Sequence, residues 1–312
     1  MTRVLVTGGA GYIGSHVVSQ LIRNGVEVAV IDDLSTGRID RLKNFDIDFY
    51  QGSVGDKQLL LRALKGTDVV LHLAACKSVG ESMTNPLKYW RSNLEVTLSL
   101  LECCELSDVN KIIFSSTAAV YEPISDRNIS EVDRLKPLSV YGETKLAGER
   151  LFANWGFLEN RNFIILRYFN VAGSGSKGMQ DDSKDNLIPK IISQVSNNQV
   201  TQIYGINYDT QDGTCIRDYL HVNDVARAHF LALERIQADP IQITLNVGSG
   251  KGYSVKEVIN SIAQKMGKTI PSIDAGRRLG DGARLVADTN RISEFLGWHT
   301  QHDLDEIVES SI

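Results

Sequence analysis

Tyr141 and Lys145 are the residue pair in this sequence best suited to proton transfer. Both lie near the start of a predicted helix, residues 140–155. Residues four apart share one face of a helix, so we expect the Lys145 ammonium near the Tyr141 phenol. A nearby cation lowers the pKa of a tyrosine from its usual value of about 10, which would make Tyr141 a general base near neutral pH. The alternative is an aromatic side chain in the core beside a solvated lysine.

A threonine hydroxyl follows the predicted strand that precedes this helix. Thr117 ends the run Phe114-Ser-Ser-Thr, directly after the strand over 111–115. Its hydroxyl suits donation to a substrate oxygen on which charge develops. The alternative is a threonine that bonds to its own turn.

The glycine-rich stretch from Gly8 to Gly14 lies between a buried strand and a helix over 13–21. Gly9, Gly11 and Gly14 fit the dinucleotide fingerprint, and Gly8 fits a second register with glycines three apart. Backbone N–H groups and the positive end of the helix dipole favour a pyrophosphate at such a turn. A tight turn packed under a helix is the alternative.

Two adjacent carboxylates, Asp32 and Asp33, end the second predicted strand, 27–31. An acidic residue at this place accepts hydrogen bonds from the adenosine ribose hydroxyls and repels a 2′-phosphate. The sequence therefore favours NAD over NADP, although Arg38 follows closely. For Asp33, helix capping is the alternative role.

Strand and helix patterns alternate through the first half of the chain, which predicts an α/β fold with a doubly wound parallel sheet of Rossmann type. The further strands are expected at 47–51, 68–73, 111–115 and 163–168, and the helices at 57–64, 85–104 and 140–155. Polar clusters follow four strands, at Asp32, 72–77, 115–117 and 168–170. Because ligands bind at the carboxyl ends of such strands, we expect these clusters to form one crevice.

After residue 170 the pattern changes, which predicts a smaller C-terminal lobe that binds substrate. We expect a nucleotide-binding domain over 1–170, rejoined by 218–248, and a second lobe from 171–217 and 249–312. A polar loop is expected at 173–182. The later helices are expected at 187–196, 224–236, 254–266 and 303–309, with strands at 202–204 and 243–247.

The composition and charge of the chain indicate which classes of binding partner to expect. The chain has 312 residues, a formal charge of −5 and a pI of about 5.7. We therefore expect no nucleic-acid partner, and without a long apolar run we expect no membrane span. The chain passes directly from Met1-Thr2-Arg3 into the first predicted strand, so we expect no signal peptide. The four cysteines lack the spacing of a metal site, so we expect no metal and a reduced, cytoplasmic protein.

Several blocks together resemble the extended short-chain dehydrogenase/reductase family, over essentially the whole chain. Within it, the chain is similar to the branch that epimerises UDP-hexoses at C4. The blocks are residues 6–16, 32–37, 77–87, 114–121, 141–145, 166–170 and 211–222.

The resemblance implies an NAD-dependent isomerase of galactose metabolism that interconverts UDP-glucose and UDP-galactose. NAD stays tightly bound, Tyr141 takes the proton of the C4 hydroxyl, and hydride passes transiently to NAD. The 4-keto sugar then turns and is reduced on its other face. Lys145 would tune Tyr141, and Thr117 fills the family's Ser/Thr position. Members are commonly homodimers that pair the helices near 93–104 and 143–155.

The resemblance also implies which residues contact each ligand. For NAD these are Gly8, Gly11, Tyr12, Ile13, Gly14, Asp32, Asp33, Ser53, Val54, Leu73, Ala74, Ala75, Lys77, Asn93, Ser115, Tyr141, Lys145 and Tyr168. For the UDP-sugar they are Lys77, Thr117, Tyr141, Asn170, Asn186, Leu187, Tyr204, Arg217, Arg278 and Asp281.

The sequence departs from the family pattern at a few positions. Ser53 stands where an aspartate usually contacts adenine, Glu122 replaces a glycine, and Leu285 occupies the position that gates bulky sugar substituents. Epimerisation of UDP-N-acetylhexosamine or UDP-glucuronate therefore stays open. Ala118-Ala119 stand where dehydratases carry acidic residues, which disfavours that rival. A non-catalytic NAD-binding sensor is the remaining alternative.

Overall fold

The computed structural model describes residues 2–124, 126–278 and 282–312. The chain divides into two compact units. Unit 1 comprises residues 1–120, 135–167 and 225–245, and unit 2 comprises residues 121–134, 168–224 and 246–312. Each unit is therefore assembled from segments that are separated along the chain.

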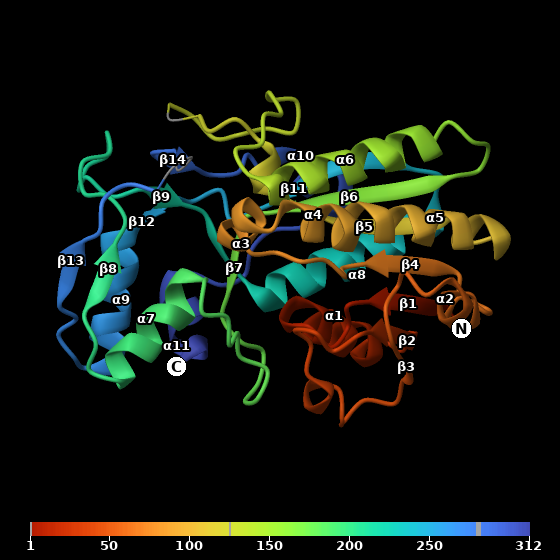
Figure 1. Ribbon diagram of the computed structural model, residues 1–312, viewed down its shortest axis with the longest axis horizontal. Coiled ribbons are helices and arrows are strands. Elements are labelled where there is room, and N and C mark those ends of the chain that lie inside the picture. The colour runs from red at the N-terminus through yellow and green to blue at the C-terminus, as the bar shows by residue number, and fades with distance from the viewer. Residues whose placement is uncertain (1, 125, 279–281) are drawn as a thin grey trace. The chain divides into compact units, whose positions relative to one another are not determined.

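A seven-stranded sheet forms the centre of unit 1 (Figure 1). Its strand order is β11-β6-β5-β4-β1-β2-β3. The pairs β1–β2, β1–β4, β2–β3 and β4–β5 are parallel, with Val6 opposite Val30 on one side and Leu71 on the other. This is the doubly wound α/β arrangement that the alternating sequence pattern predicts, so the predicted fold class is confirmed.

The elements of unit 1 follow the predicted order closely. The strands are β1 (Arg3–Thr7), β2 (Glu27–Asp32), β3 (Asp48–Gln51), β4 (Val69–His72), β5 (Lys111–Thr117), β6 (Asn162–Tyr168) and β11 (Gln242–Val247). The helices are α1 (Tyr12–Arg23), α2 (Lys57–Ala63), α3 (Val79–Thr84), α4 (Pro86–Tyr89), α5 (Val96–Leu106), α6 (Val140–Trp155) and α8 (Val222–Ala238). Short helical turns are η1 (Ile39–Arg41), η2 (Trp90–Glu95) and η3 (Ala118–Val120).

Helices α2, α5 and α6 share one hydrophobic core with the sheet. The strands contribute β-branched and aromatic side chains that are buried on both faces, as expected for a parallel sheet. Phe114 of β5 packs against Phe152 of α6, with ring centroids 4.8 Å apart, and Trp155 continues this aromatic row. Packing of these rings fixes α6 beneath the end of β5.

The predicted helix over 85–104 is interrupted in the structure. It consists of α4, the π-helical turn η2 and α5, with Pro86 at the start of α4. The interruption was not predicted, because a π turn changes the backbone hydrogen bonds without changing the hydrophobic pattern. Helix α3 was also missed, since it is short and mostly exposed.

Unit 2 contains several small sheets and a separate core. Its strands are β7 (Asn170–Ala172), β8 (Thr201–Ile203), β9 (Ile216–Arg217), β10 (Tyr219–His221), β12 (Tyr253–Ser254), β13 (Ser272–Asp274) and β14 (Arg284–Leu285). Its helices are α7 (Leu187–Ser196), α9 (Val255–Met266), α10 (Asn290–Leu296) and α11 (Leu304–Ser311). Apolar faces of α7, α9 and α11 pack together in its core. Residues 173–182 form the predicted loop, whereas α10 and most of the short strands were not predicted.

Candidate active site

The glycine turn after β1 is too tightly packed for side chains. A Cβ on Gly14 would lie 2.1 Å from the Gly8 carbonyl oxygen, and one on Gly8 would lie 2.8 Å from the Ala74 nitrogen. Gly8 also has a φ of +71°, which favours glycine. Gly11 is the N-cap residue of helix α1 and provides no side-chain cap, and the first turn of the helix has no acidic residue. Its N-terminal amides and dipole therefore suit an anionic group.

Asp32 organises the loop that faces this turn. Its carboxylate accepts hydrogen bonds from the backbone N–H groups of Ala10 (2.9 Å) and Leu34 (2.8 Å). Burial raises the pKa of Asp32, and these two hydrogen bonds oppose the rise. Asp33 instead accepts from the backbone and hydroxyl of Ser35, so it shapes a turn and caps no helix.

Arg38 and Ser53 flank the region predicted to hold the adenosine. The Arg38 guanidinium pairs with Asp40 at 2.6 Å. Ser53 is exposed, and its hydroxyl accepts a hydrogen bond from the Gly55 backbone at 3.1 Å, while Val54 beside it is buried. The serine hydroxyl therefore stabilises its own turn, a role that a carboxylate would also fill.

A buried histidine supports the loop after β4. Thr7 Oγ1 accepts hydrogen bonds from the backbone N–H groups of Leu73 and Ala74, both at 3.1 Å, so its proton points to His72 Nδ1 at 2.8 Å. His72 Nε2 lies 3.0 Å from Thr97 Oγ1. Burial lowers the pKa of His72 to about 3, so the ring is neutral and holds the loop by hydrogen bonds alone.

Asn93 lies inside the π-helical turn η2 and joins two elements. Its side-chain oxygen accepts from the Cys76 backbone at 2.8 Å, and its amide donates to the Cys76 carbonyl and to Thr144, both at 3.0 Å. This fixes the segment that carries Ala75 and the exposed Lys77. The Lys77 ammonium lies 6.0 Å from the ring centre of Tyr12, next to Ile13 in α1. Asn93 was predicted to contact the cofactor; in the structure it positions the backbone beside Lys77.

Tyr141, Thr117 and Lys145 come together at the end of β5. The Tyr141 and Thr117 side chains are hydrogen-bonded. Lys145 is buried, and its ammonium donates to the Ser115 carbonyl at 2.8 Å and lies 4.8 Å from the Phe114 ring centre. Burial lowers the pKa of Lys145 to about 8, against the opposing effect of nearby acidic groups.

The predicted lowering of the Tyr141 pKa is wrong for the protein itself. The protein atoms crowded around its hydroxyl raise its pKa to about 12, although the bond to Thr117 opposes the rise. The spacing correctly placed Lys145 one turn away, but the lysine ammonium is directed at the Ser115 carbonyl. Burial of the Tyr141 hydroxyl therefore has a larger effect on the Tyr141 pKa than the Lys145 ammonium has.

Several of the predicted substrate residues lie in unit 2. Asn170 begins β7 with its N–H bonded to the Asp218 carbonyl, and Tyr168, a predicted NAD contact, is the buried last residue of β6. Asn186 is the first flanking residue of α7, directly before Leu187, and its side-chain amide donates to Asp181 at 2.5 Å.

Two cations surround Tyr204 in unit 2. The Arg278 guanidinium carbon lies 3.6 Å from the Tyr204 ring centre, and the Lys190 ammonium lies 5.3 Å from it. Hydrogen bonding to Arg278 is the first cause of a lowered Tyr204 pKa. Arg217 lies opposite Leu285 in the β9–β14 pairing. Asp281 lies outside the described residues.

Asp218 is a structural residue that the sequence analysis missed. It is fully buried, and its carboxylate accepts hydrogen bonds from the Ser249 backbone (2.7 Å) and hydroxyl (2.6 Å), from Gly250 (3.0 Å) and from Ala287 (3.1 Å). Burial raises its pKa to about 6. Its place directly after Arg217 in a recognised block was the available signal.

A family model matches most of this chain. The model of the NAD dependent epimerase/dehydratase family covers residues 4–248. The chain belongs to this family. Among curated members, UDP-glucose 4-epimerase of Halalkalibacterium halodurans is 42% identical over 98% of this chain and 93% of its own length.

Solved structures of family members match the whole fold. One is UDP-glucose-4-epimerase from Stenotrophomonas maltophila with bound NAD and formylated UDP-arabinopyranose, with a TM-score of 0.96 at 34% identity over 100% of this chain and 97% of that one. Another is UDP-glucose 4-epimerase from Brucella ovis in complex with NAD, with a TM-score of 0.94 at 38% identity over 99% and 97%.

The residues of this family member fit NAD. The uncapped α1 N-terminus and the glycines without room for a Cβ suit a diphosphate, and Asp32 lies at the end of the neighbouring strand. In the ranges that the structure describes, no group of three His, Cys, Asp or Glu residues has the arrangement of a metal site. Over the same ranges, every helix is too short or too polar to cross a membrane.

Proposed function

We propose that this chain is an NAD-dependent isomerase that interconverts UDP-glucose and UDP-galactose by inverting C4 through a 4-keto intermediate. The observation that carries the proposal is the arrangement of Thr117, Tyr141 and Lys145 at the carboxyl end of β5. In the same sheet, β4 and β1 follow β5, so the glycine turn and Asp32 lie along one edge with the Tyr141 site. The relatives named above carry the same activity in their names.

The protein supplies proton transfer and orientation. Tyr141 takes the proton of the C4 hydroxyl as general base, and Thr117 donates to the same substrate oxygen. Lys145 favours the deprotonated tyrosine by its positive charge. Bound NAD supplies reversible acceptance of the C4 hydrogen with its electron pair. The amides at Gly8–Gly14 and the Asp32 carboxylate are proposed to hold it.

The UDP-sugar contacts are proposed to come from unit 2. Arg217 and Arg278 suit the diphosphate, because guanidinium groups form paired hydrogen bonds with phosphate oxygens. Asn170, Asn186 and the Leu187 backbone offer further hydrogen bonds, and Tyr204 offers a ring for uracil. The remaining predicted contact, Asp281, stays a sequence-based proposal. Leu285, opposite Arg217, is the proposed determinant of sugar size.

A panel of UDP-sugars incubated without added NAD tests the activity. We expect UDP-galactose and UDP-glucose to interconvert, because the cofactor stays bound. Tyr141→Phe should retain NAD and lose about 10²- to 10⁴-fold in rate. Tyr50→Phe, a partly buried tyrosine in β3, is the matched control and should react like the parent. An unchanged rate in Tyr141→Phe would refute the assigned role, and a deoxy-keto product would identify a dehydratase.

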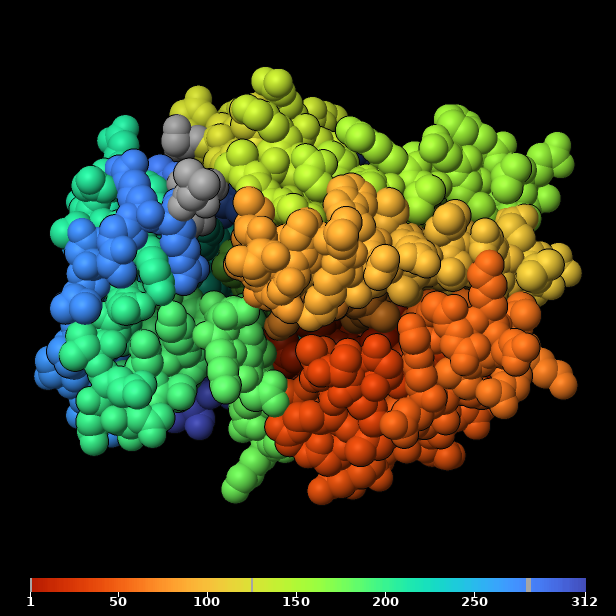
Figure 2. Space-filling model, viewed as in Figure 1, coloured from red at the N-terminus to blue at the C-terminus, as the bar shows by residue number. Residues whose placement is uncertain are grey.

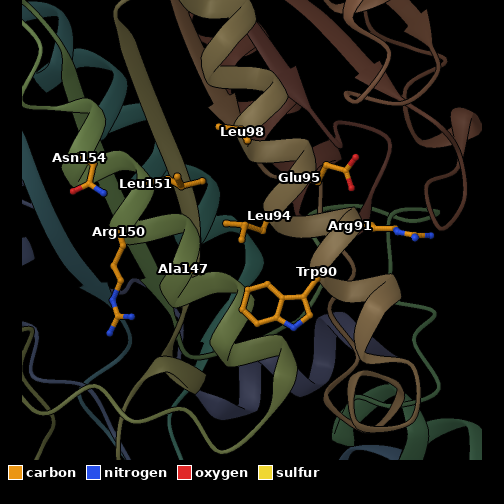
Figure 3. A pocket seen from close by; sticks show the side chains of 9 residues that line it. All are labelled: Trp90, Arg91, Leu94, Glu95, Leu98, Ala147, Arg150, Leu151 and Asn154. Atoms are coloured by element: carbon orange, nitrogen blue, oxygen red, sulfur yellow. The ribbon is translucent and has the colours of Figure 1, made fainter.

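We further propose that two copies of the chain associate through a groove between two helices. Figure 3 shows side chains from η2 and α5 facing side chains from α6. The groove is lined by Trp90, Leu94, Leu98, Ala147 and Leu151, with Arg91, Glu95, Arg150 and Asn154 among them. The orange segment of Figure 2 shows that α4 and α5 lie at the surface, and Leu98 is 46% exposed. Exposed apolar side chains beside charged ones are typical of a subunit interface.

A cytoplasmic location is proposed on the state of the thiols. The structure describes all four cysteines and places none of them in a disulfide, and Cys103, Cys104 and Cys215 are buried. Free buried thiols suit a reducing compartment. Cell fractionation with detection of the chain tests this proposal.

A further inference from the structure

Glu149 continues the face of α6 that carries Tyr141 and Lys145, at the same spacing of four residues. Its carboxylate accepts a short hydrogen bond from the hydroxyl of Ser116. Ser116 lies between two residues that contact the same helix. The Ser115 carbonyl accepts a hydrogen bond from Lys145, and the Thr117 side chain is hydrogen-bonded to Tyr141. Three successive residues of β5 thus each hold one residue of a single helix face.

A buried arginine fixes the Glu149 carboxylate from the other side. Arg167 of β6 donates from Nε to Oε1 at 2.9 Å and from its terminal nitrogen to Oε2 at 2.6 Å. The two side chains are only 5% and 6% exposed. A bidentate pair of this kind is rigid, and it ties α6 to both β5 and β6.

The Glu149 charge also acts on Lys145. Glu149 and Cys76 are the two groups that oppose the lowering of the Lys145 pKa by burial, and the Lys145 charge in turn lowers the pKa of His72. His72 is neutral, so it adds no charge to the site.

The other charged side chains on the helices packed against α6 lie at the surface. Lys88 is exposed and paired with Glu81, and Arg91 and Glu95 are exposed. Glu149 is therefore the buried carboxylate whose charge acts on Lys145.

We propose that Glu149, fixed by Arg167 and Ser116, is a positioning residue that sets α6 against β5 and keeps Lys145 positively charged. It touches neither substrate nor cofactor and acts through Lys145 and Tyr141. This inference rests on the proposed epimerase function only for its rate measurement. Its second readout is independent of activity.

The decisive variant is Glu149→Gln, which keeps the shape of the side chain and removes its charge. We expect the alkaline limb of the kcat–pH profile to move to lower pH by roughly one unit or more, because Lys145 loses its neighbouring anion. The second readout is the pH midpoint of Lys145 itself, followed by the NMR shift of its ε-carbon in lysine-labelled protein, which needs no reagent to reach the buried amine. This midpoint should fall by the same amount.

Two controls separate charge from structure. Glu149→Asp keeps the charge, so both midpoints should stay near the parent values while kcat falls because the helix is held less well. Glu105→Gln disrupts a comparable site, in which Glu105 accepts two hydrogen bonds from Arg161 and one from Trp155. It should lower stability and leave both midpoints unchanged.

The proposal is overturned if Glu149→Gln folds and both midpoints match the parent, or if Glu105→Gln shifts them equally. If Glu149→Gln does not fold, Ser116→Ala takes its place, because it loosens the carboxylate and keeps both charges. It should lower kcat severalfold with unshifted midpoints, and an unchanged kcat would refute positioning. If the parent epimerises no UDP-sugar, the proposed function fails, and the NMR midpoint of Lys145 still tests the role of Glu149.

Discussion

At the scale of single residues, burial acts on the Tyr141–Lys145 pair in two opposite directions. It raises the pKa of the tyrosine to about 12 and lowers that of the lysine to about 8, so it disfavours the charged form of both. The pair therefore depends on neighbouring groups for its charge, and Glu149 is the fixed one within α6. Above about pH 8, loss of the Lys145 proton should reduce the rate.

Asp218 gives a pH prediction with a definite sign. Its native pKa of about 6 lies above the unfolded value of 3.8, so the native state binds the proton more tightly. The stability that this proton contributes is complete below about pH 4 and lost as the pH rises through 6. Relative to Asp218→Asn, the free energy of unfolding of the parent should fall by roughly 2–3 kcal/mol between pH 4 and 7. Urea unfolding at each pH measures this difference.

Asp212 is the matched control, because its pKa is shifted the other way. Its carboxylate accepts hydrogen bonds from Thr214 and Ser254, and its pKa is lowered. Its contribution is present above the unfolded pKa and lost as the pH falls. The difference between the parent and Asp212→Asn should therefore grow from pH 3 to 5. A difference for Asp218→Asn that does not change with pH would contradict the assignment.

The types and spacing of residues were sufficient to predict that Tyr141 and Lys145 lie together at the end of β5, whereas the pKa of Tyr141 was not predictable. Gly14, Asp32, Tyr141 and Lys145 carry local signals, because each is set by a turn, a strand end or a helix repeat. The direction of the Tyr141 pKa depends on how many atoms surround its hydroxyl, which only tertiary packing determines.

At the scale of elements, the π-helical turn η2 has a specific structural role. A π turn widens the helix by one residue, and such turns occur often at functional sites. Here it contains Asn93, whose side chain satisfies both backbone groups of Cys76. The turn thereby fixes the loop between β4 and α3.

Asn93→Ala should remove this support. Three hydrogen bonds are lost and two backbone groups are left without their partner, which we expect to cost about 2–4 kcal/mol in the free energy of unfolding. NAD should also be retained less well, because Lys77 follows the released segment. Urea unfolding and the NAD content of purified protein measure the two effects.

Asn154→Ala is the control for this change. Asn154 is an exposed amide on α6 that lines the surface groove. It should alter neither stability nor NAD content by more than a small amount. Equal NAD retention in the two variants would show that η2 does not support the cofactor loop.

At the scale of the whole molecule, the groove between α5 and α6 predicts self-association. Leu98→Glu places a charge among apolar side chains of the proposed interface and should shift the chain from dimer to monomer. Light scattering after size-exclusion chromatography measures the mass. Val132→Glu changes an 87% exposed side chain in unit 2 and should leave the mass as in the parent. A parent that is monomeric at all concentrations would rule out the proposed association.

The division into units also differs from a division by chain order. We expected the whole of residues 1–170 to belong to the first domain. In the structure, residues 121–134 belong to unit 2. Ile129 pairs there with Ala287, far along the sequence. A contact between such distant residues leaves no mark in local periodicity, so it could not be predicted from this sequence.

The edge position of β11 has a consequence for synthesis of the chain. The last segment of unit 1 ends at residue 245, and β11 closes the sheet beside β6. A ribosome must therefore release more than three quarters of the polypeptide before the sheet can be completed. Until then β6 presents an open edge, and open edges of this kind attract other chains.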